Sequence, residues 1–288
     1  MNTKSLSVVI PARNEEAGLR MLLSKLRQQL PNAEIIVVDD GSTDSTSEIG
    51  RELGARVIRH PYGMGNGASI KSGARAASGE ILLFMDADGQ HDPADIPRML
   101  TMLDQGYDMV IGARDSTSQA NVGRSFANRL YNWFASWMVG HRIPDLTSGF
   151  RAVHTVKFRE FLYLLPNGFS YPTTITMSFF RAGYTVGYLT IHAHQRIGKS
   201  HIQPLRDGVR FFLIIFKIGT LYSPLKLFLP ISITFFITAL CYYGYTYSTM
   251  GRFTNMSALL FMNSVVIFLI GLVSEQITAL TYNRRDPD

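Results

Sequence analysis

The chain has 288 residues, with 28 lysines and arginines against 22 aspartates and glutamates, and a single cysteine, Cys241. One cysteine excludes an intramolecular disulfide. The formal net charge of +6 requires no nucleic acid as a partner, because phosphate-bearing substrates and anionic lipids account for it. The length allows one large domain or two ordinary ones.

Strand-like and helix-like segments alternate along the first part of the chain. The expected strands are Leu6–Ile10, Glu34–Val38, Arg56–Ile58, Ile81–Met85 and Met109–Ile111. The expected helices are Ala17–Leu30, Thr43–Leu53, Ala68–Ala77 and Asp95–Asp104. Alternation at this spacing predicts an α/β fold with a mostly parallel, doubly wound sheet.

Polar residues follow the first two strands. These segments are Pro11-Ala12-Arg13-Asn14-Glu15 and Asp39-Asp40-Gly41-Ser42. Open α/β sheets bind ligands beyond the carboxyl ends of their strands, so both segments should lie at one edge. Asp40 can accept hydrogen bonds from a base or a ribose. The alternative for Ser42, Thr43 or Asp44 is to cap the following helix.

The run Asp86-Ala87-Asp88-Gly89-Gln90 follows the uncharged strand Ile81–Met85. Hard divalent cations prefer oxygen ligands, and Mg²⁺ is usually shared between one or two carboxylates and the phosphates of a substrate. The sequence therefore predicts a metal–diphosphate site at Asp86, Asp88 and Gln90. The alternative is a polar turn that closes the strand.

A glycine-rich segment and a pair of histidines could also bind a nucleotide or a metal. The segment Gly63–Gly67 is not a G-x-G-x-x-G fingerprint, and it predicts either a loop against a nucleotide or a plain turn. His192 and His194 would share one face of a strand. They could begin a zinc site, but no third ligand lies at a usual spacing.

The C-terminal part of the chain is much more apolar. Leu227–Gly251 and Phe253–Ser274 carry no charge and are separated only by Arg252. Each run is long enough to cross a bilayer, so we expect two transmembrane helices rather than buried core helices. Glu275 follows the second run, near its cytoplasmic end, and we expect it either to snorkel toward the interface or to pair with an arginine such as Arg284.

Basic residues flank both spans but are scarce between them. They are Arg206, Arg210, Lys217 and Lys226 before the first span, and Arg284 and Arg285 after the second. The positive-inside rule therefore predicts a multi-pass protein of the cytoplasmic membrane. The part of the chain before the spans, called the head below, and both termini would lie in the cytoplasm. No signal peptide is expected, because a strand begins at once.

The segment 203–222 has its basic residues along one side of a helical wheel and a large apolar remainder. It predicts an amphipathic helix in the membrane interface; a core helix of the head is the alternative. The expected organisation is a catalytic domain over 1–202, this helix over 203–222, a transmembrane hairpin over 223–283 and a tail over 284–288. Gly271 and Ser274 could pack against another copy in a homo-oligomer.

The motifs together resemble the family 2 glycosyltransferases, which have a GT-A fold. They are Val9–Glu15 (VIPARNE), Val37–Asp44 (VVDDGSTD) and Asp86–Gln90 (DADGQ). Asp145–Arg151 (DLTSGFR) and Arg196–His201 (RIGKSH) are similar to motifs of the polyprenyl-phosphate members, such as dolichyl-phosphate mannose synthase and bacterial enzymes that act on undecaprenyl phosphate. Two C-terminal spans also occur in those members.

The resemblance implies inverting transfer of a sugar from a UDP- or GDP-sugar donor to a polyprenyl phosphate, with Mg²⁺ or Mn²⁺ bound. The implied donor-binding residues are Pro11, Ala12, Arg13, Asn14, Glu15, Val38, Asp39, Asp40, Asp86 and Ala87. The implied metal ligands are Asp86, Asp88 and Gln90. The implied acceptor-phosphate residues are Arg114, Arg124, Asn128, Arg196, Lys199 and Ser200, and the implied catalytic residues are Asp88, Arg114, Arg124 and Arg196.

The motif Arg196–His201 departs from the family pattern. Relatives often read Gly-x-Ser-Lys, whereas this chain reads Gly198-Lys199-Ser200-His201. Either Lys199 or protonated His201 would supply the positive charge.

Two other functions remain open. A processive polysaccharide synthase usually carries a Gln-x-x-Arg-Trp motif and more spans, and this sequence has neither. A non-catalytic scaffold with a transferase-like head is the other alternative, against which the intact Asp86, Asp88 and Gln90 argue.

Overall fold

The computed structural model describes residues 5–115, 122–168, 170–192, 216 and 219–283. The chain divides into two compact units, Met1–His201 and Ile202–Asp288. Of the segment 203–222, only residue 216 and residues 219–222 are described, all helical. The interfacial helix therefore stays a prediction, as does the tail.

A seven-stranded sheet with the order β3-β2-β1-β4-β6-β5-β7 forms the centre of the first unit. The strands are β1 (Leu6–Ala12), β2 (Glu34–Asp39), β3 (Arg56–Arg59), β4 (Ile81–Phe84), β5 (Met109–Arg114), β6 (Arg151–His154) and β7 (Val186–Ile191). Only β6 is antiparallel to its neighbours, and it pairs with β4 on one side and β5 on the other. The prediction of a mostly parallel α/β sheet is confirmed.

The direction of β6 determines which loop lies at the carboxyl edge of the parallel strands. The carboxyl ends of β1, β2, β4 and β5 lie at one edge of the sheet. Because β6 runs the opposite way, it begins at this edge, where Arg151 pairs with both Phe84 and Ile111. The loop that precedes β6 is thereby brought to the strand ends that the sequence marks as a ligand site.

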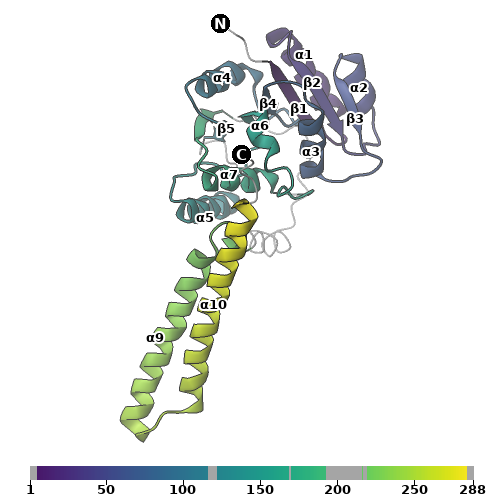
Figure 1. Cartoon of the computed structure of the whole chain (residues 1–288). Helices are drawn as coiled ribbons and strands as arrows, with labels where there is room; N and C mark the ends of the chain where they lie inside the picture. The colour runs from purple at the N-terminus through teal and green to yellow at the C-terminus, as the bar shows by residue number, and fades with distance from the viewer. Residues whose placement is uncertain (1–4, 116–121, 169, 193–215, 217–218, 284–288) are drawn as a thin grey trace. The chain divides into compact units, whose positions relative to one another are not determined.

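Helices cover both faces of this sheet (Figure 1). They are α1 (Glu16–Gln29), α2 (Thr46–Glu52), α3 (Asn66–Ala76), the 3₁₀ turn η1 (Pro93–Asp95), α4 (Ile96–Asp104), α5 (Val122–Val139), α6 (Thr155–Arg159) and α7 (Tyr171–Arg181). On α1, the leucines spaced for one helical face are all buried against the strands, namely Leu19, Leu22, Leu23 and Leu26. Burying each leucine contributes about 2 kcal/mol.

The expected helix over Thr43–Leu53 starts three residues late, at Thr46. The amides before it bond to side chains from the end of β1 and the start of α1. Thr43 donates to Asn14 Oδ1 at 2.8 Å, and Ser45 donates to Glu16 Oε2 at 3.2 Å. Asp44 Oδ1 accepts from the Thr46 amide at 3.1 Å, but the N-cap residue of the helix is Ser45, so none of Ser42, Thr43 and Asp44 is the N-cap.

The second unit contains α9 (Pro224–Met250) and α10 (Asn255–Asn283), both long and apolar enough to cross a membrane. Two serines bond reciprocally between them: Ser232 Oγ donates to the Ser264 carbonyl at 2.8 Å, and Ser264 Oγ to the Ser232 carbonyl at 3.0 Å. An ideal Cβ at Gly271 would lie 2.7 Å from Phe228 Cβ. Gly271 therefore faces α9 of its own chain rather than a second copy.

Glu275 accepts a hydrogen bond from the backbone of α9. Its Oε2 accepts a hydrogen bond from the Leu225 amide at 3.2 Å, in the first turn of α9. The first amides of a helix lack partners within that helix, and Glu275 supplies one of them. Arg284, the expected partner, lies outside the described residues.

Candidate active site

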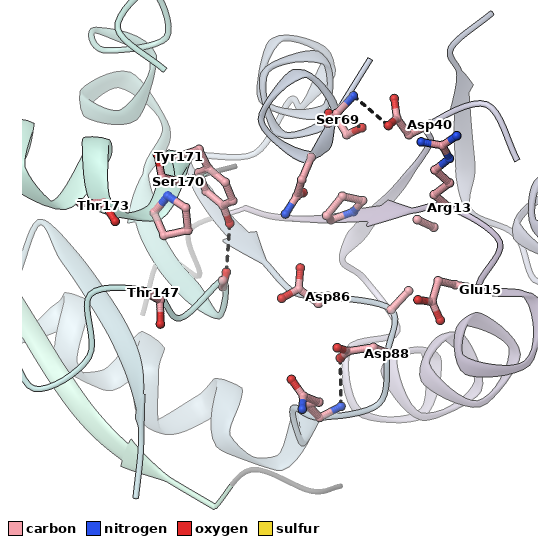
Figure 2. Close-up of a pocket in the computed structure, with 18 of the residues that line it drawn as sticks. Arg13, Glu15, Asp40, Ser69, Asp86, Asp88, Thr147, Ser170, Tyr171 and Thr173 are labelled. Atoms are coloured by element: carbon pink, nitrogen blue, oxygen red, sulfur yellow. Dashed lines mark hydrogen bonds between the residues drawn. The ribbon is translucent and has the colours of Figure 1, made fainter. Parts of the chain in front are cut away.

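A pocket of about 500 Å³ lies at the carboxyl edge of the sheet. In Figure 2, Asp86 and Asp88 lie between a wall that carries Arg13 and Glu15 and an opposite wall that carries Thr147 and Tyr171. We call these the β1 wall and the α7 wall. A pocket of this size accommodates an organic ligand.

Most of the predicted residues that the structure describes line this pocket. They are Pro11, Ala12, Arg13, Glu15, Asp40, Asp86, Ala87, Asp88, Gln90 and Arg114. Asn14, Val38 and Asp39 are not among the lining residues. Val38 is buried inside the sheet, while Asp39 is buried and accepts hydrogen bonds from the Ser42 amide and the Ser47 hydroxyl.

Part of the predicted acceptor site is beyond the described side chains. Arg124 and Asn128 lie on α5, whose first residues are described by backbone only. Arg196, Lys199, Ser200 and His201 lie outside the described residues, as does His194. The roles given to these residues stay predictions.

Asp40 organises the glycine-rich segment. Its carboxylate accepts hydrogen bonds from His60 Nδ1 at 2.9 Å, from the Met64 amide at 2.7 Å and from the Gly65 amide at 2.8 Å. Burial by itself raises the pKa of Asp40, but these hydrogen bonds outweigh it and lower the pKa below its ordinary value. Gly65 and Asn66 are thereby held in the pocket lining.

The metal candidates sit on the turn after β4. Asp88 is buried, and its Oδ1 accepts a hydrogen bond from the Gln90 amide at 3.2 Å. Within the described ranges, no three histidine, cysteine or acidic side chains gather closely enough to hold a metal ion. Two carboxylates and an amide make an incomplete oxygen shell, which suits a cation that completes its coordination with phosphate oxygens and water. The donor set thus fits Mg²⁺ or Mn²⁺ better than zinc.

The loop Asp145–Phe150 packs directly against this turn. An ideal Cβ at Gly149 would lie 2.6 Å from Asp86 Oδ2, so any other residue at this position would displace that carboxylate from its present place. The His91 ring stacks on Phe150 with centroids 5.1 Å apart. Burial lowers the pKa of His91 to about 4, so the ring is neutral at pH 7. The stacked, neutral ring thus helps to shape the loop.

Arg151 forms hydrogen bonds with the same loop. It is fully buried, and its guanidinium donates to the Ser148 carbonyl at 2.7 Å, to the Leu146 carbonyl at 3.3 Å and to Thr176 Oγ1 at 2.6 Å. Hydrogen bonds of this kind satisfy buried carbonyls that would otherwise destabilise the fold. Arg151 therefore links the loop to α7.

Arg114 is held by the loop as well. Its Nε donates to Asp145 Oδ2 at 2.8 Å, and its Nη2 donates to Asp145 Oδ1 at 3.1 Å and to Thr147 Oγ1 at 2.6 Å. Burial opposes the charged guanidinium, but Asp145, Asp86 and Asp88 outweigh it and raise the pKa of Arg114. A permanently charged, bidentate-anchored arginine thus faces the pocket beside the metal candidates.

Apart from Arg114, the residues of the α7 wall were missed by sequence reasoning. It consists of Arg114, Thr147, Gly149, Ser170, Tyr171, Pro172 and Thr173. The Tyr171 hydroxyl donates to the Gly149 carbonyl at 3.4 Å (Figure 2). The available signal was the Asp145–Arg151 motif, which pointed to the loop without indicating its place; nothing in the pattern marked the start of α7.

We expect Gly149→Ala to lower transfer activity roughly 10²-fold, because a shift of about 1 Å in a catalytic group has an effect of this size. The added methyl group displaces the Asp86 carboxylate, so the metal concentration for half-maximal activity should rise as well. The matched control is Gly168→Ala, where an added Cβ meets nothing within 4 Å. Equal activity of the two variants would show that Asp86 does not depend on the space at Gly149.

Two family models match the chain, one for each unit. The model of glycosyl transferase family 2 matches residues 7–162, and the model of the GtrB C-terminal hairpin matches residues 223–280.

Curated relatives and solved structures agree with these models. The chain is 26% identical to a dolichyl-phosphate hexose transferase from Haloferax volcanii, over 74% of this chain and 93% of that protein. It is 32% identical to an undecaprenyl-phosphate 4-deoxy-4-formamido-L-arabinose transferase from Photorhabdus laumondii, over 52% of this chain but only about half (49%) of that longer protein. Glucosyl-3-phosphoglycerate synthase from Mycobacterium tuberculosis has the same fold, with a TM-score of 0.60 at 22% identity, over 75% of this chain and 78% of that one. The chain therefore belongs to glycosyl transferase family 2.

Proposed function

We propose that the protein transfers a sugar, with inversion, from a UDP- or GDP-sugar to a polyprenyl phosphate at the cytoplasmic face of a membrane. One observation carries the proposal. A single pocket contains two carboxylates suited to a metal–diphosphate and, beside them, an arginine anchored on a wall whose described residues include no general base.

The donor half of the proposal rests on the metal candidates. Asp86, Asp88 and Gln90 would hold Mg²⁺ or Mn²⁺, and the bound ion would neutralise the charge that grows on the leaving diphosphate. The glucosyl-3-phosphoglycerate synthase structure contains Mn²⁺ and UDP, which supports a nucleotide donor here. Arg13, Glu15 and Asp40 line the β1 wall, where the nucleoside would lie.

The acceptor half rests on the chemistry of the α7 wall. Its described residues offer hydroxyl groups and Arg114 but no carboxylate or imidazole. A sugar hydroxyl acceptor needs a general base to remove its proton. A phosphate monoester, with a second pKa of about 6, is already largely ionised near neutral pH. It needs orientation, for which a planar guanidinium is suited. The wall therefore favours a phosphate acceptor over the hydroxyl acceptor of a polysaccharide synthase.

The membrane location in the proposal rests on α9 and α10. Both are long enough to span a bilayer, and the hairpin family model matches them. Relatives are named for transfer to dolichyl and undecaprenyl phosphates, which are membrane lipids. The basic residues that flank the spans support a cytoplasmic active site. Arg124 and Arg196 would add further positive charge around the acceptor phosphate.

Transfer by the purified protein in lipid vesicles tests the proposal. The assay supplies radiolabelled UDP- and GDP-sugars in turn, with undecaprenyl phosphate and either Mg²⁺ or Mn²⁺. We expect metal-dependent label in the lipid phase with one donor, and NMR of the product should show an inverted anomeric centre. Tight donor binding without any lipid product would exclude this acceptor class. Neither binding nor transfer would favour the non-catalytic scaffold.

A further inference from the structure

Asp40 has little hydrogen-bonding capacity left for a ligand. An ionised carboxylate only accepts hydrogen bonds, and its two oxygens offer about four acceptor positions. Oδ1 accepts from His60 Nδ1 at 2.9 Å and from the Met64 amide at 2.7 Å, and Oδ2 accepts from the Gly65 amide at 2.8 Å. Asp40 nevertheless lines the pocket. Among the described residues, these three partners leave one acceptor position, on Oδ2, for a bound molecule.

His60 fixes which oxygen of Asp40 remains available. Its ring is buried, and its second nitrogen, Nε2, lies 2.9 Å from Ser72 Oγ on α3. Because both ring nitrogens have partners, the ring cannot turn away from Asp40 without leaving buried polar groups unsatisfied, which is unfavourable. His60 thereby keeps Oδ1 occupied, and Oδ2 is the oxygen that can accept from a ligand.

Arg13 lies against the same glycine-rich segment that Asp40 binds. An ideal Cβ at Gly63 would overlap the Arg13 guanidinium, and both Arg13 and Asp40 line the pocket (Figure 2). A guanidinium only donates hydrogen bonds. A ligand that meets both residues therefore needs a single N–H or O–H group for Asp40 and an oxygen or nitrogen acceptor for Arg13.

Uracil and guanine differ in the groups that they present to such a site. Uracil has one N–H between two carbonyl oxygens, whereas guanine has an N–H and an amino group side by side, next to a single carbonyl. Guanine would need acceptor positions on both oxygens of the carboxylate, and His60 and the Met64 amide already occupy those on Oδ1. Uracil needs only the position on Oδ2, and its carbonyl oxygens can accept from Arg13.

We propose that His60 is a positioning residue that makes the nucleotide site selective for uracil over guanine, so that the sugar donor is a UDP-sugar. This inference rests on the proposed function, because it requires a nucleotide whose base lies at the β1 wall. His60 is not among the residues that line the pocket, so it acts through Asp40. Its effect is on the choice of base and not on the transfer step.

Binding of UDP and GDP to the full-length protein tests the proposal. Each nucleotide is titrated calorimetrically into the protein in detergent with Mn²⁺ and without acceptor lipid. We expect UDP to bind roughly tenfold more tightly than GDP, because guanine would leave a buried N–H group unpaired. His60→Leu frees an acceptor position on Oδ1, so the ratio of the two dissociation constants should fall severalfold. His60→Asn keeps an N–H group near the place of Nδ1 and should restore the ratio.

The matched control is His141→Leu, the same substitution at an exposed histidine outside the pocket lining. It should keep the ratio of the parent protein. A dissociation constant does not depend on how much of the protein is folded, so partial unfolding of His60→Leu would not imitate a changed ratio.

Two results would overturn the proposal. GDP that binds the parent protein as tightly as UDP would show that the site does not select uracil. A His60→Leu protein that loses affinity for UDP and GDP equally would limit His60 to a structural role. Selective binding of UDP without any transfer to lipid would support this inference and contradict only the proposed acceptor. Binding of neither nucleotide would contradict the proposed function and this inference with it.

Discussion

Asp88→Asn should lower the rate of sugar transfer by about three orders of magnitude, with donor affinity also reduced. The substitution keeps the size of the side chain but removes one of the two charges available to a divalent cation. A metal ion at a developing diphosphate contributes several kcal/mol of transition-state stabilisation, and each 1.36 kcal/mol corresponds to about tenfold in rate. The measurement is the initial rate with saturating donor across a titration of Mn²⁺.

Asp104→Asn is the matched control, because Asp104 is an exposed aspartate at the end of α4. It should retain the activity and metal dependence of the parent protein. An Asp88→Asn protein that stayed within a few-fold of the parent, with the same metal requirement, would remove Asp88 from the metal site.

Asp145→Asn should destabilise the head by about 3 kcal/mol, because breaking one half of a buried ion pair leaves the other charge uncompensated. The Asp145 side chain is 7% exposed and that of Arg114 is 25% exposed. Asp95→Asn is the control: Asp95 pairs with Arg98 at a similar distance of 2.7 Å, but the Arg98 side chain is 59% exposed. Exposed pairs contribute less than about 1 kcal/mol. Thermal unfolding midpoints of the two variants in detergent compare the effects directly.

The difference between parent and Asp145→Asn should depend on pH. Burial raises the pKa of Asp145, but the hydrogen bonds and charge of Arg114 outweigh it and lower the pKa below its ordinary value. A carboxyl group with a lowered pKa in the folded state stabilises the fold fully above its unfolded pKa of about 4. That stabilisation is lost as the pH falls through the lower, folded pKa. The two midpoints should therefore converge below pH 4; a constant separation would mean that the charge of Asp145 is not what stabilises the loop.

The metal turn could be predicted because its position depends on one local rule. A turn that directly follows a strand presents Asp86 and Asp88 at the carboxyl edge of a parallel sheet, and both line the pocket. The neighbouring pair Asp39 and Asp40 shows the limit of that rule. Only Asp40 reaches the pocket, since Asp39 is the last residue of β2 and turns toward Ser42 and Ser47. Adjacent carboxylates look equivalent in the sequence, but strand geometry sends them to opposite sides.

Apart from Arg114, the α7 wall could not be predicted, because its position depends on the pairing of strands that lie far apart in the chain. The motif Asp145–Arg151 was recognisable, yet its contact with Asp86 requires β6 to enter the sheet between β4 and β5. No local pattern specifies that pairing. Likewise, the hydrogen bond from the Leu225 amide to the Glu275 carboxylate could not be predicted, because no sequence pattern displays a backbone group.

The place of β6 also sets the order in which the chain can fold as it leaves the ribosome. β1, β2 and β4 are complete early, but β4 has a strand partner only on its β1 side until Arg151–His154 has been synthesised. Its four residues, Ile81 to Phe84, are entirely apolar. An unpaired apolar edge strand readily joins another chain. The nascent head therefore passes through a stage at which it is prone to aggregation, and the strand that ends this stage is the one whose preceding loop completes the active site.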